Sequence, residues 1–555
     1  MNYDPLGIKA NFRTIQLAWI SHPQQVIEAQ KELVASYWAL SLNAWTALTA
    51  GEPAAAFSAK VAAGDERFID PAWHDNFANS LVVQNYLTYT RWLERVIYDT
   101  PGVEKKESRT AAFWIRQWFN ALAPSNFFLM NPVAGRKAWE TGGASLIRGV
   151  ENICSDINAG DLQMMGKSSL MVGKELANAP GSVIFRNDLM EVIQYASTSK
   201  KVHTIPIVFV PPWINKYYIL DLNEQKSMIR FMVAEGFTVF VISWKNPGVQ
   251  MAATSFENYI MDGLLKAIQV ACDVCQVAQV HAAGYCIGGS ALTTLMGWLN
   301  QKYKDKGQIP VAHWTLLSSL ADFSKPGEIE AFINDAAVSH LEASMASLGY
   351  LDKTQLSATF RMLRPNSLIW HYYVHKYLFG ETPPPLDILA WNDDSTRLAR
   401  AMHAFCLREF YMENNLAKKN GIVLDGTPID LAQITQPLYA VGTTEDHITP
   451  WKETFKIAQL VKGPVRYTLS TSGHILGIIN PPSAISKRAY WVGDATGAAD
   501  GLEWEAQQTK QAGSWWGDWT TWLHAHCGAL KSAPKVGRSN YPTLCHAPGT
   551  YVLEK

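Results

Sequence analysis

Gly284-Tyr285-Cys286-Ile287-Gly288-Gly289 is the stretch around which this 555-residue sequence is interpreted. It follows a short apolar run, residues 279–283, and precedes residues 290–296, which have helical character. A strand, a sharp turn with glycine on both sides and a helix form the context of a nucleophile elbow, here with cysteine in place of the usual serine. The dipole of the following helix favours the thiolate of Cys286. A buried cysteine beside a glycine-rich turn fits these six residues equally well, so the rest of the chain has to decide.

Apolar runs alternate with helical segments from about residue 180 onward. Near-continuous apolar runs of this kind are typical of strands in a parallel sheet that is covered on both faces. The predicted strands are residues 183–185, 190–195, 205–210, 237–244, 312–320, 437–442 and 466–469. The first two of these form a pair, and a long helix over about 253–275 precedes the strand of the elbow. The pattern predicts an α/β fold.

Two further polar residues follow later strands of the same predicted sheet. Asp446 comes just after the strand that ends at residue 442, and His474 comes just after the next strand. The order nucleophile, acid, histidine is that of α/β-hydrolase sites, and residues at the ends of parallel strands converge on one crevice. We therefore predict a Cys286, Asp446 and His474 site. His447 is a rival base and Glu445 is a rival acid.

The same geometry predicts the donors that stabilise an oxyanion. One is the backbone N–H of Ile287, the residue after the nucleophile. The second comes from the loop that follows the strand at 205–210. Because the prolines that open this loop cannot donate, Trp213 and Ile214 are the two candidates, and the sequence does not choose between them.

A cysteine nucleophile also narrows the chemistry. A thiolate is both a good nucleophile and a good leaving group. An acyl group can therefore arrive from a thioester and be passed on to another acceptor at little cost, which simple hydrolysis would not require. The residues predict acyl transfer through an acyl-cysteine.

The remaining segments suggest a domain organisation. Residues 1–180 are predicted to be a mostly helical N-terminal domain, with helices near 23–43, 76–99, 109–122 and 142–158. Residues 181–555 form the predicted catalytic domain. Between about 325 and 430 the alternation stops, and this helical, aromatic insert is placed where a cap over the site would be.

Composition excludes several classes of function. The formal net charge is −1, so nothing favours a nucleic-acid partner. The sequence shows no long apolar run and no secretory leader, and seven cysteines fit a reducing cytoplasm. The C-x-x-C of Cys272 and Cys275 lies on a predicted helix and is interpreted as core, without a zinc partner set. The 21 tryptophans suggest an aromatic-rich surface or pocket.

Beyond these derivations, the chain resembles the single-subunit polyhydroxyalkanoate synthases from about residue 65 to its end. The matching motifs are GYCIGG (284–289), VPPWINKYYILDL (210–222), SWKNP (243–247), RPN (364–366), EDHITPW (445–451), SGH (472–474) with NPP (480–482), GSWW (513–516) and APGTYV (547–552). Tyr285 resembles the short-chain, class I type. Residues 185–188 and 447–452 look more like the medium-chain type, and Lys245 stands where the family commonly has arginine.

The resemblance implies an α/β-hydrolase fold with a helical cap and a polymerase of (R)-3-hydroxyacyl-CoA, with 3-hydroxybutyryl-CoA as the expected substrate. Cys286 would carry the acyl or growing polyester chain, His474 would deprotonate it, and Asp446 would act on the 3-hydroxyl group. It also implies a homodimer, no cofactor, and a cytoplasmic location at the surface of storage granules with their associated proteins. A cysteine hydrolase or thioesterase and a non-catalytic granule protein are the alternatives.

Overall fold

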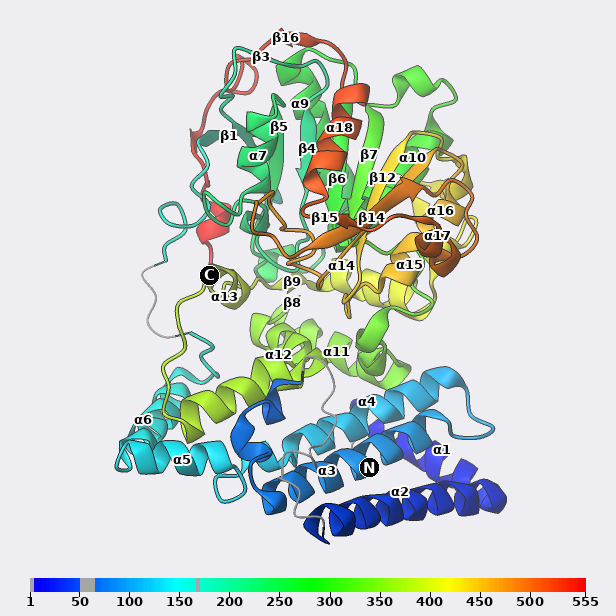
Figure 1. Ribbon diagram of the computed structural model, residues 1–555. Helices are drawn as coiled ribbons and strands as arrows, with labels where there is room; N and C mark the ends of the chain where they lie inside the picture. The colour runs from blue at the N-terminus through cyan, green and yellow to red at the C-terminus, as the bar shows by residue number, and fades with distance from the viewer. Residues whose placement is uncertain (1–3, 50–64, 166–169) are drawn as a thin grey trace. The chain divides into compact units, whose positions relative to one another are not determined.

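The computed structural model describes residues 4–49, 65–165 and 170–555 (Figure 1). The chain divides into two compact units. The first unit comprises Met1–Ser168, Glu330–Ala337 and Ser357–Pro385, and the second comprises Ser169–Ile329, Val338–Leu356 and Leu386–Lys555. The two units are distinguished by the contacts between their residues, which do not show whether either unit folds independently. The predicted domain boundaries therefore stay predictions.

An eleven-stranded mixed sheet forms the centre of the second unit, in the order β15-β14-β13-β12-β7-β6-β4-β5-β2-β1-β17 (Figure 1). Its strands are β1 (Gly181–Arg186), β2 (Met190–Tyr195), β4 (Ile207–Val210), β5 (Val239–Trp244), β6 (Val280–Tyr285), β7 (Val311–Leu317), β12 (Leu438–Thr443), β13 (Val465–Ser470), β14 (Ala489–Asp494), β15 (Gln511–Ala512) and β17 (Cys545–His546). Short two-stranded sheets join β3 (Lys201–His203) to β16 (Leu530–Ser532), β8 (Tyr350–Leu351) to β9 (Leu398–Ala399) and β10 (Val423–Leu424) to β11 (Thr427–Pro428).

The sheet is parallel only at its centre. Strands β13, β12, β7, β6, β4 and β5 pair in parallel, as the sequence predicts. The flanking pairs of β1 with β2, β2 with β5 and β13 with β14 are antiparallel. The short connection between β1 and β2 explains the first of these, because parallel neighbours need a long crossover connection.

Helices cover both faces of this sheet. Strand β4 shows why: Val208 and Val210 belong to one apolar core, and Ile207 and Phe209 belong to the other. Side chains alternate between the two faces along a strand, so a strand covered on both sides is apolar throughout. The covering helices are α9 (Lys266–Cys275) and α10 (Ile287–Lys302) on one face and α7 (Met228–Ala234) and α18 (Trp516–His526) on the other.

The first unit is helical. Its helices are α1 (Ile8–Ser21), α2 (Pro23–Thr49), α3 (Phe77–Tyr98), α4 (Lys105–Ala121), α5 (Pro132–Glu140) and α6 (Ala144–Ala159). Helices α2, α3, α4 and α6 lie close to the predicted ranges, whereas α1 and α5 match no predicted helix. Helix α2 extends six residues beyond the predicted end at residue 43. No helix among the described residues is both long and apolar enough to cross a membrane.

The segment after β7 is helical, as the loss of strand alternation predicts. Its elements include α11 (Asp335–Leu348), α12 (Lys353–Leu363), α13 (Asp387–Asp393) and α14 (Arg400–Phe405), together with the π-helical turns η10 (Asn366–Trp370), η11 (Tyr373–Leu378) and η12 (Cys406–Met412). Parts of this segment belong to each of the two compact units. Whether it acts as a cap stays a prediction.

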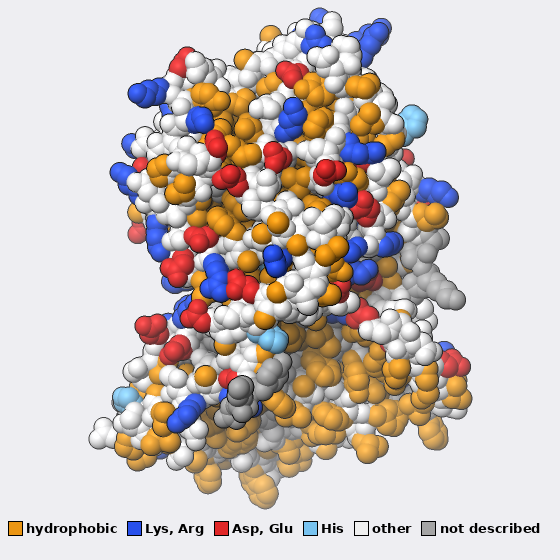
Figure 2. All heavy atoms as spheres, turned by 180° about the vertical axis from the view of Figure 1, so that it is seen from behind, with side chains coloured by type: hydrophobic (Ala, Val, Ile, Leu, Met, Phe, Trp, Pro, Cys, Tyr) orange, Lys and Arg blue, Asp and Glu red, His pale blue; other side chains and the backbone are white. Residues whose placement is uncertain are grey.

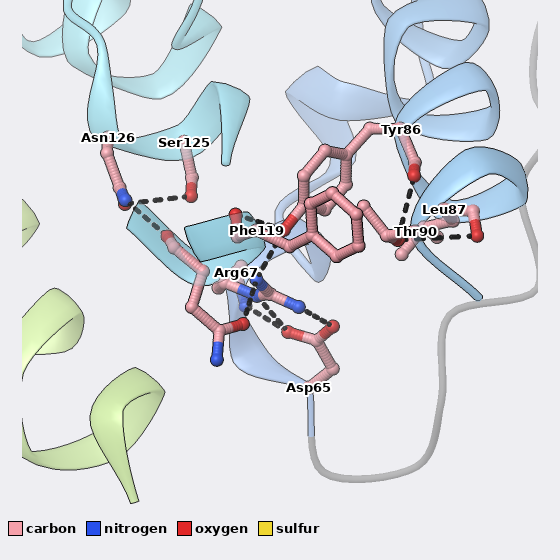
Figure 3. Close-up of polar contacts among 9 residues, drawn as sticks. Asp65, Arg67, Tyr86, Leu87, Thr90, Phe119, Ser125 and Asn126 are labelled. Atoms are coloured by element: carbon pink, nitrogen blue, oxygen red, sulfur yellow. Dashed lines mark hydrogen bonds and ion pairs between the residues drawn. The ribbon is translucent and has the colours of Figure 1, made fainter. Parts of the chain in front are cut away.

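A polar cluster fixes the segment before α3, for which the sequence suggests no chemistry (Figure 3). Arg67 donates two hydrogen bonds of 2.8 Å to the carboxylate of Asp65. A third nitrogen of the guanidinium lies 3.1 Å from both Tyr86 Oη and Asn120 Oδ1. Tyr86 in turn donates to the backbone carbonyl of Phe119. The cluster therefore ties the segment at 65–67 to helices α3 and α4.

Candidate active site

The backbone at Cys286 has the strained conformation of a nucleophile elbow. Its φ and ψ angles are 53° and −129°, a region that L-residues rarely occupy. Cys286 lies between the last residue of β6 and the first residue of α10, and its amide donates to the carbonyl of Leu317 over 2.9 Å. The strain is thus held by the sheet and by the helix that follows.

The flanking glycines are required by close backbone contacts. A Cβ atom at Gly284 would lie 2.5 Å from Cα of Gly289, and one at Gly288 would lie 2.4 Å from the carbonyl oxygen of Val210. Both distances are shorter than any side chain tolerates. The prediction that side chains here would collide with neighbouring elements is confirmed.

His474 lies between Cys286 and Asp446. Its Nδ1 atom is 2.8 Å from Oδ2 of Asp446, and the imidazole also hydrogen-bonds with the side chain of Cys286. Because Nδ1 is occupied by the carboxylate, the other ring nitrogen, Nε2, is the one available to the thiol. The structure thus brings together the three residues that the sequence places after β6, β12 and β13.

The carboxylate of Asp446 is enclosed by donors. Its side chain is 0% exposed. Oδ1 accepts from the amides of Ile448 and Thr449 at 2.9 and 2.8 Å. Oδ2 accepts from the hydroxyls of Thr443 and Thr449 and contacts His474. A carboxylate with this many donors is held ionised and fixed in position.

The charges of the buried pair support each other. Burial disfavours the charged form of His474, but the adjacent Asp446 and Cys286 outweigh it and raise the pKa of His474 above its usual value. Burial likewise opposes ionisation of Asp446, and the charge and hydrogen bond of His474 lower its pKa below the usual value. The site therefore stabilises the imidazolium that forms when His474 takes the thiol proton.

The amides predicted for the oxyanion hole are available. Within the described part of the chain, the backbone N–H groups of Ile287, Trp213 and Ile214 donate to no other atom. The carbonyl oxygens of Trp213 and Ile214 both lie 2.8 Å from Thr396 Oγ1, whose one proton they share, and this contact fixes their loop. The close approach of Gly288 to Val210 brings this loop to the first turn of α10. The choice between Trp213 and Ile214 stays open.

Two residues of the site have no role in the sequence-based prediction. Thr449 Oγ1 lies 2.8 Å from Asp446 Oδ2 and 3.2 Å from His474 Nδ1. Tyr285 stacks on the imidazole of His474 with a centroid distance of 5.5 Å, and its hydroxyl donates to the backbone carbonyl of His474. Both residues lie inside quoted motifs, but nothing in their spacing indicates these contacts.

The contacts at the site run through the predicted residues, since Asp446 contacts His474 and His474 contacts Cys286. The rival acid Glu445 and the rival base His447 stay alternatives. Cys272 and Cys275 lie on α9, where burial raises the pKa of each thiol to about 12. This agrees with their interpretation as core residues. Among the described residues, no group of three or more histidine, cysteine or acidic side chains could hold a metal ion.

Comparison with known proteins identifies the family. Residues 64–232 match the family described as the poly-beta-hydroxybutyrate polymerase (PhaC) N-terminus, and residues 206–481 match the alpha/beta hydrolase fold. A poly(3-hydroxyalkanoate) polymerase of Methylorubrum extorquens is 38% identical over 545 residues, which cover 97% of this chain and 88% of that protein.

The chain belongs to the poly(3-hydroxyalkanoate) polymerase family.

Other members of the polymerase family are similarly related. The poly(3-hydroxyalkanoate) polymerase subunit PhaC of Cupriavidus necator is 36% identical over 96% of this chain and 89% of its own length. Poly(3-hydroxyalkanoate) polymerase 1 of Ectopseudomonas oleovorans is 35% identical over 88% of this chain and 87% of its own length. The predicted family, the α/β-hydrolase fold and the prediction of an acyltransferase are confirmed.

Proposed function

We propose that this polymerase converts (R)-3-hydroxyacyl-CoA, with 3-hydroxybutyryl-CoA as the first substrate to test, into polyester with release of CoA. The contact of His474 with both Cys286 and Asp446, in a chain of this family, is the observation that carries the proposal. In the first step His474 takes the proton of Cys286, and the sulfur attacks the thioester carbonyl. The tetrahedral intermediate collapses by expelling the CoA thiolate, which takes the proton back from His474.

Chain growth needs a second deprotonation. The 3-hydroxyl group of one acyl unit gives its proton to a base of the site and attacks the acyl-cysteine carbonyl of another. An ester bond forms, and the Cys286 thiolate leaves and takes the proton from that base. The amide of Ile287, with that of Trp213 or Ile214, stabilises the oxyanion in both steps. No cofactor takes part in this scheme, and the substrate itself is a CoA thioester.

The contacts of Asp446 bear on which residue removes the hydroxyl proton. The family resemblance implies Asp446 itself. However, its carboxylate is fully buried, and both oxygens already accept hydrogen bonds. We therefore assign both deprotonations to His474, with Asp446 holding the imidazole and balancing its charge.

The proposed location of the enzyme is the surface of cytoplasmic polyester granules. There it would act as a homodimer beside granule-associated proteins. Exposed apolar side chains of the first unit support attachment to an apolar polymer. Trp38 and Trp45 of α2 are 74% and 67% exposed, and Trp139 of α5 is 88% exposed. Figure 2 shows hydrophobic side chains gathered over the helices of this unit. Such patches mark interaction sites.

The test is an assay of CoA release over a series of acyl chain lengths, with the size of the product measured. We expect stoichiometric CoA release and insoluble polymer from the unaltered chain, and loss of both in Cys286→Ala. Polymer made by Cys286→Ala would contradict the proposal. Free hydroxy acid without polymer would identify a hydrolase, and polymer binding without CoA release would identify a granule protein.

A further inference from the structure

A pocket of about 600 Å³ lies against the two loops that carry Asp446 and His474. Glu445, which lines the pocket, directly precedes Asp446, and the lining residue Ser472 is two positions before His474. The volume is within the range of small-molecule sites. Cys286, Asp446 and His474 do not line this pocket, so it is a separate binding volume beside the candidate active site.

Positive charge predominates among the lining residues. Lys226, Lys487 and Arg488 line the pocket, with Glu445 as the acidic residue. Lys226 is paired with Asp387 at 2.8 Å. Lys487 and Arg488 have no ion pair or side-chain hydrogen bond with any other described residue. The pocket therefore offers two cations whose charge is not balanced by a direct contact.

The backbone at Arg488 is held in place by hydrogen bonds. Arg488 directly precedes β14, and two hydrogen bonds between Thr471 and Ala489 join the start of this strand to the end of β13. The amide of Arg488 also donates to Ser486 Oγ. A cation with an ordered backbone loses less conformational entropy when it binds a ligand.

A buried donor at the pocket has no partner. Asn480 lines the pocket and is 4% exposed, yet its amide nitrogen Nδ2 makes no hydrogen bond with any described residue. Buried polar groups are ordinarily paired, and an unpaired one calls for an explanation. Nδ2 is closed to solvent as the side chain stands, so an acceptor atom of a ligand in the pocket would supply the missing partner once the amide turns toward it.

We propose that this pocket binds the phosphate-bearing nucleotide end of an acyl-CoA. This inference rests on the proposed function. Phosphate oxygens are acceptors for lysine and arginine and for the amide of Asn480. The growing polyester is neutral and would gain little from these cations. The pocket lies beside the catalytic loops, so it would hold the nucleotide while the thioester reaches Cys286.

The test compares two thioesters that differ only in the nucleotide. The Michaelis constant is measured for 3-hydroxybutyryl-CoA and for 3-hydroxybutyryl-pantetheine with the Lys487→Ala/Arg488→Ala variant. We expect its KM for the CoA thioester to rise about tenfold and its KM for the pantetheine thioester to change less than twofold. The matched control, Lys304→Ala/Lys462→Ala, removes the same charge from exposed lysines elsewhere in the unit, and it should change neither value.

A binding measurement tests the pocket without requiring turnover of a substrate. Titration calorimetry with adenosine 3′,5′-bisphosphate should show binding to the unaltered chain that weakens at least fivefold in the double variant and in Asn480→Ala. Inorganic phosphate at the same concentration tests whether the site takes any phosphate, and equal affinity for it would overturn the nucleotide assignment. Equal KM changes for both thioesters, or for the control, would overturn the pocket itself. Failure of the unaltered chain to release CoA would instead overturn the proposed function.

Discussion

At the scale of single residues, the candidate site depends on groups that hold the side chains predicted to be catalytic. Thr449 has no proposed contact with substrate, but its hydroxyl lies within hydrogen-bond distance of both Asp446 and His474. Its oxygen also lies 3.1 Å from the carbonyl oxygen of Ser318, next to the end of β7. Thr449 is thus a positioning residue that links the loop after β12 to the imidazole.

Replacing Thr449 by valine removes this hydroxyl and preserves the shape of the side chain. A hydrogen bond to a charged group contributes about 1.5 kcal/mol or more, so kcat/KM for CoA release should fall about tenfold. Steady-state kinetics measure the effect. Thr449→Ser keeps the hydroxyl and should recover most of the activity. A kcat/KM for Thr449→Ser as low as that for Thr449→Val would contradict the role assigned to the hydroxyl.

At the scale of elements, Figure 3 shows how one side chain fixes the entry to the helices of the first unit. Arg67 is mostly buried, with 14% of its side chain exposed, and it reaches Asp65, Tyr86 and Asn120 at once. Only a planar guanidinium offers donors in these directions, since a lysine ammonium is a point charge.

Arg67→Lys should therefore destabilise the first unit although it keeps the charge. Leaving the buried acceptors of Tyr86 and Asn120 without this donor costs about 2 kcal/mol. Urea unfolding followed by tryptophan fluorescence measures the loss. Arg95→Lys is the matched control, because its pair with Glu32 is exposed and such pairs contribute at most about 1 kcal/mol. Equal destabilisation by the two variants would contradict the role assigned to Arg67.

At the scale of the whole molecule, a buried pair of histidines joins two neighbouring strands of the central sheet, β6 and β7. The pair lies at the end of β6 that is remote from Cys286. Nδ1 of His281 on β6 lies 2.6 Å from Nδ1 of His313 on β7. His313 Nε2 donates to the carbonyl of His526, and His281 Nε2 accepts from Thr315, whose oxygen accepts from Trp519. Every ring nitrogen has a partner when both imidazoles are neutral, so protonation of either ring breaks the network.

Stability should consequently fall in mild acid. Burial, and then the charge of His526, lower the pKa of His313 from 6.5 to about 4. Below about pH 6.5 the unfolded chain binds a proton that the folded chain does not, so this contribution is complete above that pH and is lost as the pH falls towards 4.

The loss assigned to His313 is about 3 kcal/mol, since each pH unit contributes about 1.4 kcal/mol per proton. Urea unfolding of the second unit at pH values from 7.5 to 4 should show this slope, and His313→Gln should flatten it. His340→Gln, which makes the same substitution at an exposed histidine, serves as the control. A slope in His313→Gln equal to that of the unaltered chain would contradict the assignment.

Much of the architecture is predictable because its signals are local. Near-continuous apolar runs predict the central strands, and the glycines at 284 and 288 predict the elbow, since backbone contacts there leave no space for a side chain. The mixed character of the sheet is less predictable. The antiparallel pairing of β13 with β14 follows from contacts between whole strands and not from the composition of either.

Motif spacing and strand alternation are properties of the chain alone, so the sequence is enough to predict the family, the fold and the order of the candidate residues Cys286, Asp446 and His474. Tertiary structure decided what these residues contact. It encloses Asp446 in donors, places Thr449 against His474, and brings Lys226, Asn480 and Arg488 to one pocket. Such contacts join segments far apart in sequence, and no local periodicity encodes the distance between their side chains.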